Sequence, residues 1–206
     1  MKKTIIILLL FILQVSSANA NSQNISKTIL FLGDSLTEGL GVEKQNAFPK
    51  LVEDLIQKNL EKNINVINGG VSGSTTSDAL TRLKWYLKKK PYLVFIALGA
   101  NDGLRGLNLK KSQENLEEII NFALKSNAKV LLAGMLIPPN YGEDYAKEFK
   151  EMYENIKVKY KLKTMKFLLE DVAGKKELNQ RDGIHPNEEG HKIIAKNVFN
   201  FLKEEL

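Results

Sequence analysis

Five short apolar runs alternate along the chain with five segments of helical periodicity, and this pattern predicts a three-layer α/β/α fold. Parallel strands need helical crossovers to join them, so the alternation indicates a five-stranded parallel sheet, flavodoxin-like and covered by helices on both faces. No linker, internal repeat or low-complexity stretch interrupts residues 27–206. We therefore expect this stretch to form a single domain.

The runs that predict strands are continuous and apolar, as expected of strands buried on both faces. The first, residues 28–32, stops sharply at Gly33. The other four cover residues 65–68, 92–98, 129–135 and 166–169. Ligands of such sheets bind beyond the carboxyl ends of the strands, so the residues that follow each run are the first candidates for chemistry.

The helical segments are recognised by apolar residues that recur every three or four positions. They cover residues 48–56, 80–87, 116–124, 145–156 and 193–202. Ser112 precedes the third segment and is typical of a helix N-cap. The lysine cluster Lys84, Lys88, Lys89 and Lys90 at the end of the second segment indicates a solvated helix end, because cations complement the helix dipole there. Weak attraction to an anionic membrane surface is the alternative.

Residues 1–20 have the composition of a secretory signal peptide. Lys2 and Lys3 precede nine apolar residues, and small residues end the segment at Ala20. A membrane-spanning helix would need about 20 apolar residues. The chain contains no cysteine, so no lipid can be attached to a cysteine at the cleavage point. We expect export to the periplasm or out of the cell, with residues 21–26 as a polar leader.

Removal of residues 1–20 from the 206-residue chain leaves 186 residues and lowers the formal charge from +6 to +4. The remaining lysines are spread along the chain, which argues against nucleic-acid binding. Two histidines and no cysteine form no zinc-binding pattern. We expect no metal and no cofactor, and the sequence does not predict an oligomeric state.

Four short polar blocks stand where chemistry is expected. Three follow the first, second and third predicted strands, and the fourth precedes the last helix. They are Gly33-Asp34-Ser35-Leu36, Val71-Ser72-Gly73-Ser74, Gly99-Ala100-Asn101-Asp102 and Asp182-Gly183-Ile184-His185-Pro186. The carboxyl ends of parallel strands meet at one edge of a sheet, so we expect these blocks to converge.

A nucleophilic serine can be assembled from the first and last blocks. A serine hydroxyl attacks esters poorly at neutral pH unless a neighbouring base accepts its proton. His185 follows Asp182 by three residues across a glycine, so a tight turn can bring the carboxylate to one ring nitrogen while the other nitrogen faces Ser35. The sequence therefore predicts Ser35, His185 and Asp182 as a catalytic triad. His191 is expected to be an ordinary surface side chain.

The four blocks, in this order, resemble those of the SGNH hydrolases, also called the GDSL lipase/esterase family. The stretches 99–106, 138–142 and 182–187 are similar to the bacterial periplasmic branch of thioesterases, lysophospholipases and arylesterases. An aspartate is common in that branch where this chain has Ser74, which affects the local hydrogen bonding and not the triad.

The resemblance implies an oxyanion hole formed by the backbone N–H groups of Ser35 and Gly73 and the side-chain amide of Asn101. Taken singly, Gly73 and Asn101 are also ordinary turn residues. Asp34 and Asp102 are expected to shape their loops. Leu104, Leu107, Ile137, Pro138 and Tyr141 are candidates for the apolar wall of the substrate pocket.

The function implied by the resemblance is hydrolysis of carboxylic esters or thioesters through an acyl-enzyme. The substrate would be a small-molecule acyl ester or a lipid, with fatty acyl esters and lysophospholipids favoured. A carbohydrate or peptidoglycan O-acetylesterase is the alternative enzyme. A catalytically inactive binding module is a third possibility, but such a module would be expected to have lost Ser35, Asn101, Asp182 or His185, and all four are present.

Overall fold

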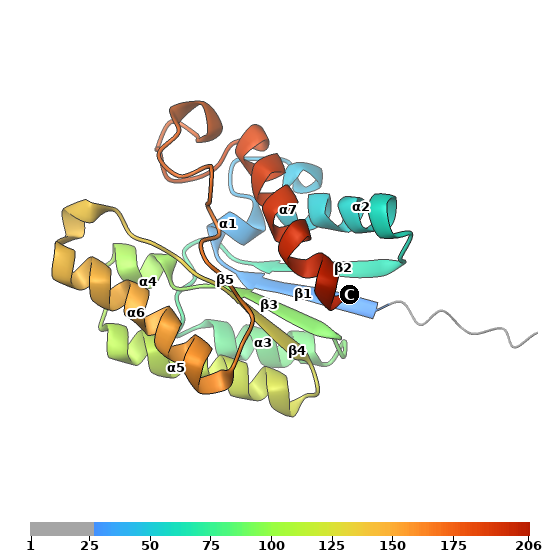
Figure 1. Ribbon diagram of the computed structural model, residues 1–206, viewed down its shortest axis with the longest axis horizontal. Helices are drawn as coiled ribbons and strands as arrows, with labels where there is room; N and C mark the ends of the chain where they lie inside the picture. The colour runs from blue at the N-terminus through green and yellow to red at the C-terminus, as the bar shows by residue number, and fades with distance from the viewer. Residues whose placement is uncertain (1–26) are drawn as a thin grey trace, which may run out of the picture.

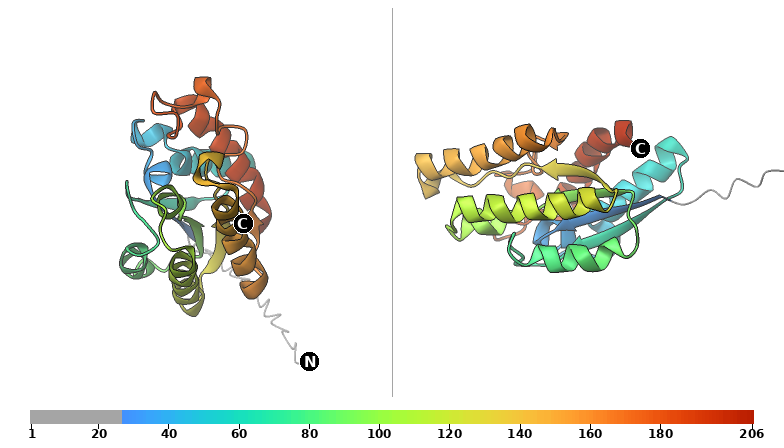
Figure 2. Two further views of the ribbon diagram at one scale, coloured as in Figure 1. Left: turned by 90° about the vertical axis from the view of Figure 1, so that its left-hand side faces the viewer. Right: turned by 90° about the horizontal axis from the view of Figure 1, so that it is seen from below.

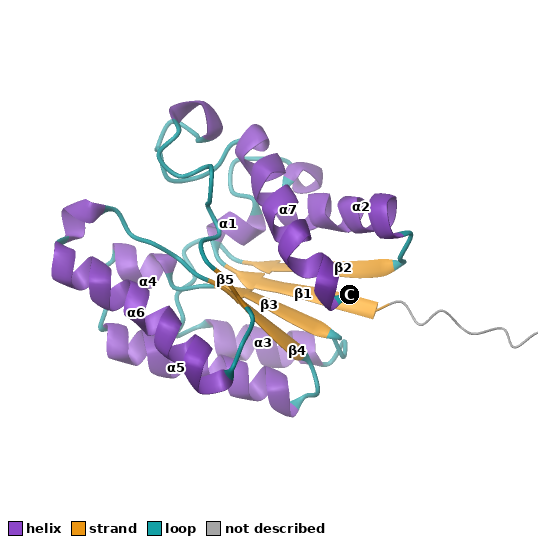
Figure 3. Ribbon diagram, viewed as in Figure 1, coloured by secondary structure: helices purple, strands orange, loops and turns teal. Residues whose placement is uncertain are grey.

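In the computed structural model, which describes residues 27–206, five parallel strands form one twisted sheet in the order β2-β1-β3-β4-β5 (Figures 1 and 3). The strands are β1 (Lys27–Gly33), β2 (Ile64–Gly70), β3 (Leu93–Ala97), β4 (Lys129–Ala133) and β5 (Thr164–Met165). The predicted three-layer α/β/α class is thereby confirmed. The predicted signal peptide and the polar leader lie outside the described residues.

Helices cover both faces of the sheet. The helices α2 (Phe48–Leu60) and α7 (Glu188–Leu202) pack against each other on one face. The opposite face carries α3 (Ala79–Leu87), α5 (Leu109–Lys125) and α6 (Glu143–Tyr160), as Figures 1 and 2 show. Two short helices, α1 (Ser35–Glu38) and α4 (Ala100–Leu104), lie at the carboxyl ends of the strands. Short helices of this kind lack a visible period, so the sequence pattern did not predict them.

The core forms around the central strands because their side chains are apolar on both faces. In β1, the four residues from Ile29 to Leu32 are fully buried. Phe31 contacts Phe48 of α2 edge-to-face and also contacts Phe95 of β3. Burial of each such aromatic side chain contributes about 1.5–3 kcal/mol of hydrophobic free energy. These central strands provide the rigid base from which the polar loops extend.

The fifth strand differs from the prediction. It comprises only Thr164 and Met165, and the predicted run 166–169 leaves the sheet. The Leu168 N–H donates to the carbonyl oxygen of Gly134 at 3.0 Å, outside the strand ladder. Phe167 and Leu169 line a cavity at the end of the sheet. Phe167 and Leu169 therefore form part of a cavity wall and not of a strand. A short apolar run in the sequence does not distinguish between these two roles.

Two smaller expectations concern helix ends. Ser112 is not an N-cap: α5 begins earlier, and the Asn108 side chain accepts the Lys111 N–H at 2.9 Å. Asn108 lies about one turn before Ser112, and its side chain caps the helix there. In the lysine cluster, Lys84 lies in the last turn of α3 and the other three lysines follow its last residue, as predicted for a helix end. Within residues 27–206, no helix combines the length and apolar character required to cross a membrane.

Candidate active site

The first three polar blocks begin at one level of the sheet because their strands end together. Gly33 of β1 pairs with Gly70 of β2 and with Ala97 of β3. The chain runs from β1 outward to β2 and then crosses to β3 on the other side of β1. The direction in which strands are added to the sheet therefore reverses at β1, and open α/β sheets commonly bind ligands at such a position.

Ser35 is the first residue of α1 and follows a tight turn at the end of β1. The Asp34 side chain accepts the Leu36 N–H at 3.0 Å and so caps α1. A Cβ at Gly33 would lie 1.9 Å from Thr37 Oγ1, so the turn closes only with glycine at this position. The Ser35 side chain is consequently presented at the end of the central strand of the sheet.

The predicted triad residues are brought together across 150 positions of sequence. Ser35 Oγ lies 2.9 Å from His185 Nε2. On the other side of the ring, His185 Nδ1 lies 2.7 Å from Asp182 Oδ2. A carboxylate at Nδ1 requires the proton there, which leaves Nε2 free to accept the proton of Ser35.

The turn that holds Asp182 and His185 is fixed by the same carboxylate. Asp182 Oδ1 accepts the backbone N–H groups of Ile184 and His185, each at 3.0 Å. The hydrogen bonds from the His185 ring and backbone lower the pKa of Asp182 from 3.8 to about 2. Asn187 then caps α7 by accepting the Gly190 N–H at 3.0 Å. The histidine is therefore anchored between an Asx-type turn and a helix start.

Asn101 lies in the first turn of α4 and lines the cavity beside Ser35. Its Nδ2 donates one hydrogen bond to the carbonyl oxygen of Ser74 at 3.0 Å. A side-chain amide has two donor hydrogens, so the second one is available to a ligand. The geometry is compatible with the predicted oxyanion role of Asn101, which stays a prediction.

Gly73 lies in an exposed turn, outside the cavity lining. Its φ of +76° lies in the left-handed region that favours glycine. Its N–H makes no hydrogen bond within residues 27–206, so this donor is also uncommitted. The structure thus leaves the Gly73 N–H and the second amide hydrogen of Asn101 without an acceptor among the described residues.

The two further aspartates of the blocks are buried. Burial raises the pKa of the Asp34 carboxyl from 3.8 to about 6. Its Oδ2 has no hydrogen-bond partner among the described residues. Asp102 accepts from the backbone N–H and the hydroxyl of Thr76, and from the hydroxyl of Ser112. It ties the loop that follows the second block to the third block and to α5, in agreement with its expected role as a loop organiser.

Ser35 and His185 open onto a cavity of about 480 Å³ at the carboxyl end of the sheet. Its wall is predominantly apolar. Three of the five predicted wall residues line it, namely Leu104, Ile137 and Pro138, whereas Leu107 and Tyr141 do not. Sequence reasoning missed Leu36, Leu136, Phe167, Leu169 and Ile184. Leu36 and Ile184 belong to the blocks themselves, so their place beside Ser35 and His185 was an available signal.

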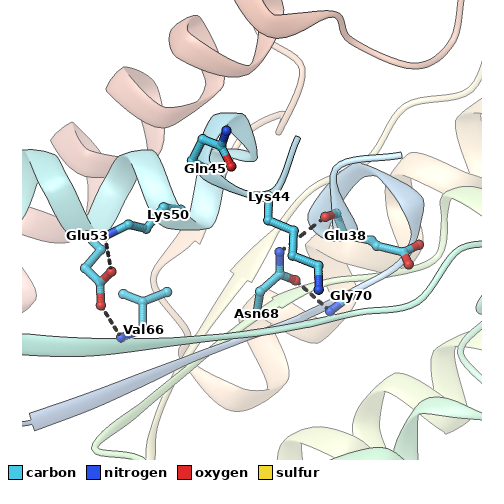
Figure 4. A pocket seen from close by; sticks show the side chains of 8 residues that line it. All are labelled: Glu38, Lys44, Gln45, Lys50, Glu53, Val66, Asn68 and Gly70. Atoms are coloured by element: carbon cyan, nitrogen blue, oxygen red, sulfur yellow. Dashed lines mark hydrogen bonds and ion pairs between the residues drawn. The ribbon is translucent and has the colours of Figure 1, made fainter. Parts of the chain in front are cut away.

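A second cavity, of about 530 Å³, lies at the edge strand β2 beside α2 (Figure 4). None of the triad residues lines it, and its lining is polar and charged. Glu53 Oε1 accepts the outward N–H of Val66 at 2.9 Å, and Asn68 Oδ1 accepts that of Gly70 at 3.0 Å. These side chains satisfy the free edge of the sheet, which gives this cavity a structural role.

His191 is buried, contrary to the expectation of a surface side chain. It is only 1% exposed, and its Nδ1 accepts the Phe48 N–H at 3.2 Å. The residue before Phe48, Ala47, has no side chain that could cap α2. His191 supplies the missing acceptor from α7. Burial lowers the pKa of His191 from 6.5 to about 4, so the ring is neutral at neutral pH.

The depressed pKa of His191 predicts acid sensitivity in a defined window. The unfolded chain binds a proton at this site near pH 6.5 and the folded chain only near pH 4. Stability is therefore lost as the pH falls from 6.5 to 4, by up to about 3 kcal/mol. We expect His191→Asn, which keeps an acceptor but does not titrate, to lose less unfolding free energy over this range. Denaturant titrations of both proteins at several pH values measure the difference; parallel curves would contradict it.

Within residues 27–206, no three histidine, aspartate or glutamate side chains are grouped so that they could hold a metal ion. The arrangement of Ser35, His185 and Asp182 needs none, because proton transfer and attack can proceed through side chains alone.

Comparison with known proteins gives consistent results. Residues 31–193 match the model of the GDSL-like lipase/acylhydrolase family. An arylesterase of Vibrio mimicus is 37% identical over 182 residues, which cover 88% of this chain and 90% of that protein. The thioesterase 1/protease 1/lysophospholipase L1 of Escherichia coli is 35% identical over 169 residues, with 82% and 79% coverage.

Solved structures agree with these sequence matches. The crystal structure of TesA superimposes with a TM-score of 0.83 at 36% identity and covers 87% of this chain and all of that one. The psychrotrophic esterase EstA from Pseudoalteromonas, inhibited by monoethylphosphonate, also gives a TM-score of 0.83 at 36% identity, with 87% and 98% coverage.

Proposed function

The chain belongs to the GDSL-like lipase/acylhydrolase family and is an ester-hydrolysing enzyme, and from this premise we propose that it cleaves fatty acyl esters or thioesters, including lysophospholipids. One observation carries the proposal: the contacts from Ser35 through His185 to Asp182 open onto a largely apolar cavity of about 480 Å³. A polar reacting group and an apolar chain could both be accommodated there.

In the proposed acylation step, His185 Nε2 accepts the hydroxyl proton as Ser35 Oγ attacks the carbonyl carbon. Asp182 holds the ring and stabilises the imidazolium that forms. The tetrahedral intermediate collapses when His185 returns the proton to the departing alcohol or thiol. The acyl group is then bonded to Ser35. Attack by a water molecule, with His185 again as base, releases the acid and restores the serine.

The negative charge that develops on the carbonyl oxygen needs donors already in place. We assign this role to the Ser35 and Gly73 backbone N–H groups and to Asn101 Nδ2. Donors of this kind typically contribute more than any other single factor to the rate of acyl transfer. The free hydrogen of Asn101 and the uncommitted N–H of Gly73 support the assignment.

Export to the periplasm or the exterior is part of the proposal and is supported by the sequence of residues 1–20.

The apolar wall predicts a preference for longer acyl chains. Each additional buried CH₂ can contribute about 0.8 kcal/mol of binding free energy. We therefore expect kcat/KM for p-nitrophenyl esters, measured from acetyl to palmitoyl, to rise from acetyl to medium-length chains. A kcat/KM that falls steadily beyond acetyl would instead support the O-acetylesterase alternative.

A pair of leucines gives a matched control for this series. Leu136 lines the cavity and is 46% exposed, whereas Leu124 on α5 is 41% exposed and lies outside the cavity lining. We expect Leu136→Ala to lower kcat/KM several-fold for medium chains with little effect on acetyl esters. Leu124→Ala should change neither rate. An equal effect of the two substitutions would argue against an acyl-binding wall at Leu136.

A further inference from the structure

We propose that Glu38 and Arg105 are positioning residues that set the direction of the Gly73 N–H and thereby complete the oxyanion hole. This inference depends on the proposed function of Ser35, Gly73 and Asn101 given above. Neither Glu38 nor Arg105 lines the cavity, and neither contacts a member of the triad. Their hydrogen bonds instead converge on the exposed turn that carries Gly73.

The turn itself explains why such positioning is needed. The Ser74 N–H donates to the Val71 carbonyl at 3.1 Å, so residues 71–74 form a hydrogen-bonded β-turn. Gly73 has a φ of +76°, and Ser72 is not among the residues with positive φ. This combination is characteristic of a type II turn. In a type I turn the peptide between residues 72 and 73 is rotated by about 180°, which would point the Gly73 N–H the opposite way.

Packing does not decide between the two turn types. Val71, Ser72 and Gly73 are all exposed. A Cβ at Gly73 would meet only Arg105 Nη2, at 3.4 Å, so no neighbouring backbone confines the turn. Hydrogen bonds that reach the turn from outside can therefore add to the contributions of Gly73 and of the turn's own hydrogen bond in holding this conformation.

Glu38 holds the turn on one side. This residue is the last of α1, three positions after Ser35. Its Oε2 accepts the Ser72 N–H at 2.8 Å and also the Ser72 hydroxyl. Figure 4 shows its carboxylate directed away from the rest of the pocket lining at β2. In the same view Asn68 Nδ2 donates to the Glu38 carbonyl at 3.4 Å, and it also donates to that of Thr37 at 2.8 Å, which anchors the end of α1.

Arg105 holds the turn on the other side. It is the C-cap of α4, and its Nη2 donates to the Gly73 carbonyl at 2.9 Å. The peptide that carries the Gly73 N–H is thus flanked by two peptides whose polar groups are fixed. Arg105 Nη2 also lies 3.5 Å from Asn101 Oδ1. This contact favours the orientation of the Asn101 amide in which Oδ1 faces Arg105 and Nδ2 is left as a donor for the oxyanion. One guanidinium group therefore fixes the positions of the Gly73 and Asn101 donors relative to each other.

Kinetics of alanine variants test the proposal. Glu38 and Arg105 are exposed, so Glu38→Ala and Arg105→Ala should fold with melting temperatures within a few degrees of wild type. We expect each to lower kcat by about 10- to 100-fold, part of the about 10²–10³ lost when an oxyanion donor is removed. KM should stay within about threefold, because the donors act on charge that appears in the transition state. Glu38→Gln, which keeps an acceptor for Ser72, should recover most of the rate.

Two further measurements separate positioning from a general structural effect. The inhibition constant of a trifluoromethyl ketone, which forms a tetrahedral oxyanion on the serine, should rise by a factor similar to the loss of kcat/KM. The double variant Glu38→Ala/Arg105→Ala should lose less than the product of the single losses, because both residues hold the same peptide. The exposed Glu118 and Lys110 make no side-chain hydrogen bond within residues 27–206, so Glu118→Ala and Lys110→Ala are controls.

The outcomes distinguish this inference from the proposed function. The positioning role is wrong if Glu38→Ala and Arg105→Ala both keep kcat within threefold of wild type while Ser35→Ala is inactive. In that case Ser35 remains the assigned nucleophile. If Ser35→Ala is itself as active as wild type, the proposed function fails. A parallel loss of kcat and melting temperature, with no change in inhibitor affinity, would also overturn the positioning role.

Discussion

Replacement of Ser35 by alanine is expected to lower kcat by about 10⁴-fold or more. The substitution removes the atom that lies 2.9 Å from His185 Nε2 and leaves the remaining contacts of the site unchanged. Ser35 is only 8% exposed, but the substitution removes a single hydroxyl group, so little packing is lost. Hydrolysis of a p-nitrophenyl ester by the purified variant measures the effect, with the melting temperature as the check on folding.

A covalent probe provides a second readout of the same residue. A fluorophosphonate should add once per molecule, at Ser35, because only this serine has a histidine within hydrogen-bond distance among the described residues. Intact-mass measurement should show no adduct on Ser35→Ala. Ser126→Ala, at the exposed end of α5, is the control and should label and hydrolyse as wild type does. Undiminished hydrolysis by Ser35→Ala would remove the basis of the proposed mechanism.

The parts of the fold that sequence could predict are those fixed by local periodicity. Apolar runs identified β1, β3 and β4, whose side chains are buried on both faces of the sheet. The edge strand β2 is only partly buried, and its signal was the shorter run at residues 65–68. The five long helices α2, α3, α5, α6 and α7 were equally visible as amphipathic periods. The boundaries were less accurate, as α5 shows, because Leu109 is the single apolar residue of its first turn and one such residue gives no visible period.

Long-range packing explains the remaining differences. His191 sits in a polar stretch, and only the approach of α7 to the uncapped start of α2 buries it. The run 166–169 looks like a strand, but Phe167 and Leu169 line a cavity that exists only once the loops have assembled, while Leu168 packs in the core. Neither outcome is encoded in a window of ten or twenty residues.

The candidate catalytic residues could be predicted from the sequence, but the residues that hold the surrounding loops in place could not. Ser35 was indicated by its place directly after a strand, because strand ends converge in this fold, and His185 by its place after Asp182 and before the last helix. The hydrogen bonds from Glu38 and Arg105 to the turn that carries Gly73 could not be predicted in the same way. Each joins a charged side chain to backbone atoms of a distant loop, and a charged residue on a short helix otherwise predicts only a solvated surface.

Asn101 has two competing interpretations that one substitution separates. As an oxyanion donor it acts on charge that exists only in the transition state, so Asn101→Ala should lower kcat by about 10²–10³-fold, or roughly 2.7–4 kcal/mol. KM should change little. As a turn residue it would act through its bond to the Ser74 carbonyl, and its loss would lower stability with nearly normal turnover.

Asn108 provides the matched control, since it is an asparagine of known structural role seven positions away. Its side chain caps α5, and Asn108→Ala should cost about 1 kcal/mol of stability while kcat stays at the wild-type value. We expect Asn101→Ala to behave in the opposite manner, with a melting temperature within a few degrees of wild type and a large loss of kcat. Thermal unfolding and steady-state kinetics on the two variants decide the matter. If kcat of Asn101→Ala stays within threefold of wild type, Asn101 is not an oxyanion donor, and stabilisation of the intermediate must depend on the backbone N–H groups of Ser35 and Gly73.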